Sequence, residues 1–175
     1  NVNDPPTGTV TVSGTIEEDE ELTANNTLAD EDGLGNITYQ WIRDGAPIDG
    51  ATDVVYLLTQ EDVGLSLTVT ASYTDDGGTA ESVTSDATSI VENVNDVPTG
   101  TVEIIGSATE DQTLTGNNDL DDEDGLGVIS YQWRRSGAVV VDATNSTYTL
   151  TQADVGATIS VTASYTDAMG TAESV

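Results

Sequence analysis

The sequence predicts an all-β protein made of two tandem, seven-stranded antiparallel β-sandwiches arranged end to end. Residues 93–99 repeat residues 1–7 except that Val97 replaces Pro5, an offset of 92 residues (93 − 1), and the offset stays constant along the chain. Short stretches of alternating apolar and polar residues recur between turn signals roughly every 8 to 12 residues, without a convincing helical period. One Trp stands in the middle of each copy, as in the core of many sandwiches.

The first two strands of each copy follow from alternation. Val10 and Val12 alternate with hydroxyl residues, which is typical of a half-buried strand. Leu22 and Ala24 begin a second strand that is expected to end near Leu28. Residues 17–20 are acidic and form the turn between these two strands.

The third strand carries the aromatic core residues. Residues 30–36 contain two Gly and predict a loop. Tyr39 and Trp41 then share one face of a strand over residues 37–42, so we expect the Trp in the core. Arg43-Asp44-Gly45 predicts a turn.

Four more strands complete the first copy. They are expected at residues 46–48, 54–58, 65–73 and about 79–91. The sixth of the seven strands shows the cleanest alternation, with apolar residues at every second position from Leu65 to Tyr73.

The second copy repeats this pattern up to Val175, which corresponds to Val83, so its last strand is incomplete. The predicted organisation is a first domain at 1–92, a linker at 93–98 and a second domain at 99–175. Pro98 favours the linker because it fixes its own φ and keeps Val97 extended. A boundary near Thr84 is the alternative, since residues 84–175 also make one full period. We expect this chain to be a monomeric piece of a longer protein.

Composition excludes several functions. There are 32 acidic residues against 3 Arg, giving a formal net charge of −29, which opposes binding to nucleic acid. No apolar run approaches the ~20 residues that cross a bilayer, so no membrane insertion is expected. His, Lys and Cys are absent, so Ser-His, Cys-His and Schiff-base chemistry are excluded and we expect no enzyme. An acidic surface adapted to salt is the simplest alternative account of the charge.

The topology is expected to gather acidic residues where the two copies join. The turns after the first, third and fifth strands should lie at the same end as the exit of the last strand. This brings together two acids of the first copy, the linker and three acids of the second copy: Glu18, Asp62, Asn95, Asp96, Asp122, Asp124 and Asp167. Close carboxylates repel by about 1 kcal/mol at 4 Å in water, and Ca²⁺, a hard cation with six to eight oxygen ligands, would relieve this. The period places equivalent residues at the start of the first copy: Asn3, Asp4, Asp30, Asp32 and Asp75.

Three motifs carry a resemblance. They are Asn95-Asp96-Val97-Pro98, Asp122-Glu123-Asp124 and the Ala-Ser-Tyr-Thr-Asp-Asp-Gly-Gly run at residues 71–78. Together they resemble cadherin repeats, and the tandem Ig-like and cadherin-like repeats of large bacterial surface adhesins exported by type I secretion, the repeats-in-toxin class.

The resemblance implies an interdomain calcium site. In cadherins the linker Asn-Asp, a Glu near the first turn, acids before the sixth strand and an Asp-x-Asp hold Ca²⁺. Here these positions match, in that order, Asn95 and Asp96, Glu18, Asp62, and Asp122 with Asp124, while Asp167 matches the acid after that strand. Cadherins carry Asp-Arg-Glu before the sixth strand, whereas this chain has Gln-Glu-Asp at 60–62, so the number of ions per junction stays open.

Two functions remain. The first is a secreted, cell-surface extender repeat of a bacterial adhesin, stiffened by calcium, whose partners are neighbouring repeats and, through other domains, carbohydrate or a cell surface. The alternative is a carbohydrate- or protein-binding module of an extracellular protein. Equal spacing in both copies and short turns favour the extender, because recognition usually lies in elaborated loops. We expect Trp41 and Trp133 to be core residues and not a sugar-stacking platform.

Overall fold

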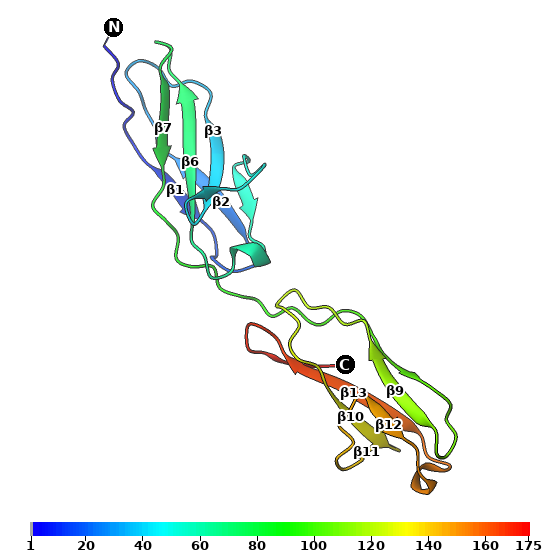
Figure 1. Ribbon diagram of the computed structural model, residues 1–175. Coiled ribbons are helices and arrows are strands. Elements are labelled where there is room, and N and C mark those ends of the chain that lie inside the picture. The colour runs from blue at the N-terminus through cyan, green and yellow to red at the C-terminus, as the bar shows by residue number, and fades with distance from the viewer. Residues whose placement is uncertain (1) are drawn as a thin grey trace. The chain divides into compact units, whose positions relative to one another are not determined.

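The computed structural model describes residues 2–175, so Asn1, the first residue of the predicted first domain, lies outside the described residues. The chain divides into two compact units, Asn1–Val94 and Asn95–Val175, coloured blue to green and green to red in Figure 1. This division falls inside residues 93–98, the expected linker. No helix in the described part of the chain is both long and apolar enough to cross a membrane.

Unit 1 is built from two antiparallel sheets. Its strands are β1 (Val10–Ser13), β2 (Glu21–Asn26), β3 (Thr38–Arg43), β4 (Ala46–Pro47), β5 (Val55–Leu57), β6 (Leu67–Thr74) and β7 (Ala80–Thr84). One sheet has the order β1-β2-β5 and the other β4-β3-β6-β7, and a single 3₁₀ turn, η1 (Gln60–Asp62), precedes β6. Core residues from both sheets pack together, so the unit is a β-sandwich, which confirms the predicted fold class.

Unit 2 repeats this architecture. Its strands are β8 (Val102–Ile105), β9 (Thr113–Asn118), β10 (Ser130–Arg135), β11 (Ala138–Val139), β12 (Thr147–Thr149), β13 (Ile159–Thr166) and β14 (Ala172–Ser174). They form the sheets β12-β9-β8 and β11-β10-β13-β14, with a 3₁₀ turn η2 (Gln152–Asp154). The registers are also equivalent: Trp41 pairs with Val69 in unit 1 and Trp133 with Val161 in unit 2.

Each core is centred on its Trp. Trp41 is fully buried, stacks on Tyr56 with ring centroids 5.6 Å apart, and donates from Nε1 to the Asp53 carbonyl at 3.0 Å. Trp133 makes the equivalent contacts with Tyr148 and the Asn145 carbonyl. The prediction of a core Trp is therefore confirmed. A buried ring with a bonded indole N–H leaves no face for stacking on a sugar.

The predicted turn at Arg43-Asp44-Gly45 is a tight hairpin between β3 and β4. Asp44 and Gly45 have φ values of 43° and 82°, and Ser136 and Gly137 of unit 2 repeat them with 46° and 85°. Two successive residues at positive φ define the turn that matches the twist of neighbouring strands. Asp and Gly tolerate this backbone better than other residues, which is why the dipeptide signalled the turn.

The seventh strand of unit 1 departs from the prediction of residues 79–91. Regular pairing with β6 ends at Thr84, and residues 85–92 continue as an irregular segment, seen in Figure 1 between β7 and the linker. The hydroxyl side chains cause this change. Ser85 Oγ accepts from the Val69 N–H at 3.0 Å and Thr88 Oγ1 accepts from the Leu67 N–H at 3.0 Å, so side chains replace backbone carbonyls in the ladder.

Candidate cation site

The loop after β9 presents two buried carboxylates at one end of unit 2. The Asp124 N–H donates to Asp122 Oδ1 at 3.0 Å, and the Tyr165 hydroxyl on β13 donates to Asp122 Oδ2. Gly125, with φ of 94°, closes the turn through a bond from its N–H to the Asp122 carbonyl. Asp122 is 7% exposed and Asp124 is 1% exposed. The Asp-x-Asp-Gly motif thus folds as a turn that holds both carboxylates in fixed directions.

Tyr165 is a dependable donor in this arrangement. Burial, the hydrogen bond to Asp122 and the surrounding negative charge raise the pKa of Tyr165 above its ordinary value. The same causes, with Asp30 as the acceptor, raise the pKa of Tyr73 in unit 1. Each phenol therefore stays protonated at any physiological pH and keeps its carboxylate in place.

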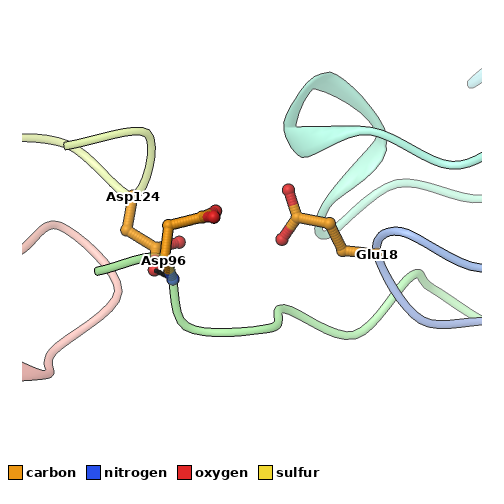
Figure 2. A group of neighbouring side chains, drawn as sticks. All are labelled: Glu18, Asp96 and Asp124. Atoms are coloured by element: carbon orange, nitrogen blue, oxygen red, sulfur yellow. Dashed lines mark hydrogen bonds between the residues drawn. The ribbon is translucent and has the colours of Figure 1, made fainter. Parts of the chain in front are cut away.

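The start of unit 2 is bonded to the same loop. The Asp96 N–H donates to Asp124 Oδ2 at 2.8 Å, and the two side chains lie next to each other in Figure 2. The Asn95 side-chain amide donates to Glu173 Oε1 on β14 at 3.0 Å. These bonds carry the linker residues to the acidic end of unit 2, so Asp96, Asp122 and Asp124 meet as predicted from the topology.

Asp167 supplies the feature that points most directly to a ligand. It lies in the turn between β13 and β14, where Oδ1 accepts from the Gly170 N–H at 2.6 Å and the Thr171 N–H at 2.8 Å. The side chain is 6% exposed, yet its Oδ2 is buried without a hydrogen-bond partner. Buried carboxylate oxygens are almost always bonded, because desolvation without a partner costs about 1–3 kcal/mol or more.

Unit 1 has the same arrangement in an independent copy. The Asp4 N–H donates to Asp32 Oδ2 at 2.8 Å and the Asp32 N–H donates to Asp30 Oδ1 at 2.8 Å. Asp75 repeats Asp167: Oδ1 accepts from the Thr79 N–H at 2.7 Å, and Oδ2 is buried with no partner. The Asn3 amide donates at 2.7 Å to a Glu carboxylate on β7.

The sequence reasoning missed that Glu pair. The Glu81 carboxylate accepts from the Asn3 side-chain amide, and the Glu173 carboxylate accepts from the Asn95 amide. In the strand register Glu81 pairs with Tyr73, and Glu173 pairs with Tyr165. The signal was available, since both Glu obey the 92-residue period. Their role depends on which residues the hairpin places side by side, and the position in sequence does not show this.

Glu18 belongs to the opposite end of unit 1, where the chain leaves the sandwich. Its side chain is 3% exposed, and Oε2 accepts from the Val94 N–H at 3.3 Å. The side-chain amide of Gln60 lies against the same carboxylate, 2.7 Å from Oε1. The predicted position of Glu18 beside the exit of the last strand is therefore observed within unit 1.

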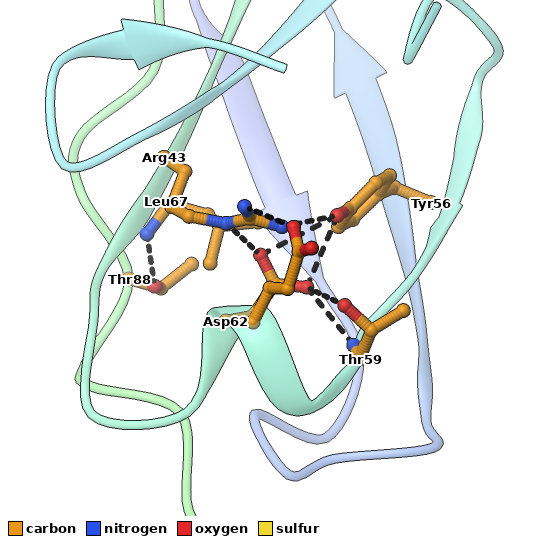
Figure 3. A network of polar contacts seen from close by, with 7 residues as sticks. Arg43, Tyr56, Thr59, Asp62, Leu67 and Thr88 are labelled. Carbon is orange, nitrogen blue, oxygen red and sulfur yellow. Dashed lines mark hydrogen bonds and ion pairs between the residues drawn. The ribbon is translucent and has the colours of Figure 1, made fainter. Parts of the chain in front are cut away.

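Asp62 has a different role from the predicted one. It is fully buried, and Oδ1 accepts from Arg43 Nε at 2.7 Å (Figure 3). Oδ2 accepts from the Tyr56 hydroxyl at 3.0 Å and from the Thr59 N–H and hydroxyl at 2.9 and 3.1 Å. Both oxygens are thus saturated by protein donors. Asp62 fixes the 3₁₀ turn η1 to the sheets, and we leave it out of the candidate ligand set.

Asp154 repeats this network in unit 2, with Arg135 Nε 2.6 Å from Oδ1. Burial by itself would raise the pKa of Asp154, but the hydrogen bonds from Arg135, Thr151 and Tyr148 outweigh it and hold the pKa well below its usual range. The bond to Asp154 likewise raises the pKa of Arg135. The network is therefore an ion pair at all ordinary pH values.

Comparisons with known proteins return distant similarities. No protein-family model matches the chain, and no curated protein matches it. Among solved structures, the three N-terminal domains of the highly immunogenic outer capsid protein of bacteriophage RB49 align with a TM-score of 0.35 and 21% identity, over 97% of this chain and 57% of that one. SGBP-B of the Bacteroides ovatus mixed-linkage glucan utilization locus, solved in complex with a mixed-linkage heptasaccharide, aligns with a TM-score of 0.32 and 14% identity, over 99% of this chain and 46% of that one. The chain thus spans about half the length of each.

Proposed function

We propose that the protein is a non-enzymatic, extracellular structural repeat that binds Ca²⁺ at its acidic ends. Its task is to extend a bacterial surface adhesin, and calcium where one unit joins the next makes the chain stiff. The observation that carries the proposal is the buried, unpartnered Oδ2 of Asp167, which stands at the same end of unit 2 as Asp122 and Asp124 and recurs as Asp75 Oδ2 in unit 1.

The ligand chemistry favours calcium. All the candidate ligand atoms are oxygens, and the chain contains no His or Cys to favour a softer metal. Ca²⁺ accepts six to eight oxygens in flexible geometry, whereas Mg²⁺ requires a near-ideal octahedron and keeps several waters. Protein donors already hold both oxygens of Asp122 and Oδ1 of Asp167. The second lone pairs of the Asp122 oxygens and the unpartnered Oδ2 of Asp167 are therefore positioned for a cation with little loss of side-chain freedom.

The linker argues for a shared ion. The Val94 N–H is bound to Glu18, and the Asp96 N–H is bound to Asp124. Only one residue separates Val94 from Asp96 in the chain, and this short connection supports the proposal of a shared ion. We propose that the three carboxylates bind one such ion together. Asn95, Asp122 and Asp167 complete the acidic end of unit 2, and Asn3, Asp4, Asp30, Asp32 and Asp75 form the matching end of unit 1.

Calcium binding would make the stiffness of the repeat depend on the calcium concentration around it. Extracellular modules bind calcium with Kd values on the order of 10⁻⁴ to 10⁻³ M. Such sites are filled outside cells and empty in cytosol, so the repeat would become stiff only after export. Partners of the repeat would then be its neighbours in the same chain. A role as a carbohydrate- or protein-binding module is the alternative, and a glycan array would test it directly.

The deciding experiment compares the chain in millimolar Ca²⁺ and in chelator by small-angle X-ray scattering and calorimetry. We expect calcium to narrow the interatomic distance distribution. Asp124→Asn and Asp96→Asn should each lower calcium affinity at least tenfold and remove the narrowing, while both sandwiches stay folded. Glu103→Gln is the matched control, because it removes one exposed charge on β8 from a residue outside the ligand set. Calcium binding by Asp124→Asn at the parental affinity would refute the assignment.

A further inference from the structure

The four-stranded sheet of unit 2 ends in a short strand with one free edge. β11 is the outermost strand and pairs only with β10, where Val139 stands opposite Arg134 (Figure 1). The Val140 N–H donates to the Trp133 carbonyl at 3.0 Å, so Val140 directs its backbone groups toward β10. Successive residues of a strand direct these groups to opposite sides. The N–H and carbonyl of Val139, and the N–H of Val141, therefore face the free edge.

This edge is apolar and carries no acidic residue. Residues 138–141 are Ala-Val-Val-Val, and the side chains of Val139 and Val141 are 50% and 79% exposed. The outward-facing residues of the neighbouring strands β10 and β13 carry hydroxyl or amide groups, apart from Arg134. Among the described residues Arg134 forms no salt bridge, and its Nη1 donates to the Gly137 carbonyl at 3.4 Å. A chain of net charge −29 thus has a local surface without carboxylates.

Unit 1 protects the equivalent edge. Pro47 takes the position of Val139, and it pairs with Ile42 in the same register. Asp49 takes the position of Val141. Proline has no N–H to offer to a further strand, and both Pro and charged residues are means by which proteins block pairing at sheet edges. β4 is the outermost strand of its sheet as well, so the free edge belongs to the fold and the two units differ in its protection.

We propose that β11 is an interaction surface through which unit 2 binds unit 2 of a second copy of the chain, strand against strand and antiparallel. The edge groups face each other when Val139 of one copy stands opposite Val141 of the other, with a twofold axis beside Val140. The free N–H and carbonyl groups of the two edges can then bond each other. The exposed valines of both copies meet on one face of the joined sheet, as cross-strand pairs that stabilise it.

Charge and shape favour a second copy as the occupant. Two chains of net charge −29 repel each other, so a contact between them needs surfaces without carboxylates, and β11 supplies one to each partner. A strand that covers Val139 and Val141 needs apolar residues at alternate positions, which β11 itself has. Two such short strands bury less than the ~1,200 Å² of a stable interface, so we expect a weak, reversible contact. The contact needs no cation and is independent of the proposed calcium sites.

The test measures self-association of the full chain in chelator, so that calcium cannot bridge the acids of two copies. Sedimentation equilibrium and amide NMR would cover about 50 µM to about 2 mM protein, a range suited to weak contacts. We expect concentration-dependent shifts centred on Val139 and Val141. Association should be stronger in about 1 M NaCl, where a Debye length of about 3 Å screens the repulsion between copies.

Substitutions that copy unit 1 should remove the contact. Val139→Pro installs the residue that unit 1 has at this position, and it should weaken association at least about tenfold because it removes one donor from each copy. Val141→Asp should weaken it similarly through like charges at the edge. Val128→Asp is the matched control: this Val is 93% exposed and lies outside β11, so the same added charge should change association by less than about twofold in about 1 M NaCl.

Cysteine substitutions test the register, because the chain has no Cys of its own. Opposed residues of a hydrogen-bonded antiparallel pair have Cα atoms about 5.5 Å apart, within the range of a disulfide. A mixture of Val139→Cys and Val141→Cys chains should therefore oxidise to mixed dimers. Either variant alone should form dimers much more slowly, since its two Cys would stand diagonally, at about 8 Å.

A gain of association gives the converse test. Pro47→Val combined with Asp49→Val removes the protection of unit 1, so the chain then has two free edges and association should continue beyond dimers. A chain that stays monomeric at about 2 mM in about 1 M NaCl would overturn the proposal. Association that persists unchanged in Val139→Pro would overturn it as well.

Discussion

At the scale of single residues, two kinds of buried Asp do different work. Asp62 is saturated by Arg43, Tyr56 and Thr59, whereas Asp167 keeps one buried oxygen without a donor. An ion pair inside a protein is costly to break from one side, since the remaining charge stays buried. The first kind of Asp therefore serves folding, and the second is suited to a ligand.

The folding role of Asp62 is open to measurement. We expect Asp62→Ala to lower the free energy of unfolding of unit 1 by about 3–5 kcal/mol, because it removes the buried partner of Arg43 Nε and leaves the Tyr56 and Thr59 donors without their acceptor. Glu61→Ala is the control: it also bonds Arg43, but its side chain is 81% exposed, so it should cost less than about 1 kcal/mol. Urea unfolding followed through resolved amide signals of each unit checks both. Equal losses for the two variants would contradict the assigned role.

The lowered pKa of Asp154 makes the stability of unit 2 depend on pH in the acidic range. Its pKa is lowered in the folded state, so its contribution to stability is complete above the ordinary value of about 3.9 and is lost as pH falls below it. Unfolding of unit 2 should become easier from about pH 4 downward, and Asp154→Asn should flatten this dependence while costing stability at neutral pH. Chemical denaturation at a series of pH values measures both effects. A parallel pH dependence in parent and variant would rule the explanation out.

At the scale of elements, close contact with the end of β13 fixes the position of the loop that follows β9 and carries Asp122 and Asp124. Gly127 crosses β13 so tightly that a methyl group there would overlap the Thr166 carbonyl oxygen, and Gly35 does the same over Thr74 in unit 1. No other residue could hold this path, because every other side chain begins with a Cβ. The loop that carries Asp122 and Asp124 is thereby held against the turn that carries Asp167.

This contact predicts a remote effect on binding. Gly127→Ala should push the loop off β13 and weaken calcium binding at least several-fold in calorimetry. The control, Gly137→Ala, lies in the β10–β11 hairpin with open space around it and a φ of 85°, so it should cost about 1–2 kcal/mol of stability by backbone strain yet leave calcium affinity unchanged. A parental affinity in Gly127→Ala would show that the loop position does not matter.

The strands and turns show which features of the fold can be predicted from the sequence. Alternation located the strands because a half-buried strand must expose every second residue, and the positive-φ turn at Asp44-Gly45 follows from backbone sterics. Pairing across strands is not encoded locally. The sequence therefore does not show the role of Glu81 opposite Tyr73. The expected topology and the resemblance to cadherins place Asp62 among the ligands, whereas the 3₁₀ turn directs its side chain inward to Arg43.

At the scale of the whole molecule, charge dominates. The 32 acidic residues face 3 Arg, which gives the net charge of −29. Among the described residues, salt bridges form at two of these Arg, Arg43 and Arg135. Like charges at this density disfavour the compact state unless salt screens them or cations bind. Screening and specific binding differ in the concentrations they need, because a site of extracellular strength fills in the millimolar range.

Thermal unfolding can separate the two effects. In NaCl, the melting temperature should rise gradually with ionic strength. CaCl₂ at matched ionic strength should add about 2.7 kcal/mol per site at a hundredfold excess over Kd, and Asp167→Asn should remove most of that addition for unit 2. Superimposed curves in NaCl and CaCl₂ would leave the acids as a salt-adapted surface.

Residues 85–92 also bear on how unit 1 responds to tension. The end of this segment pairs in parallel with two turns of the sandwich, Val91 beside Val63 and Glu92 beside Glu17. When the chain is pulled from both ends, parallel neighbours slide past each other along their length, so their hydrogen bonds are strained together and must break together. Antiparallel hairpin strands pulled from their open end separate one bond at a time. Unit 1 therefore has a mechanical clamp at the point where the chain leaves its sandwich.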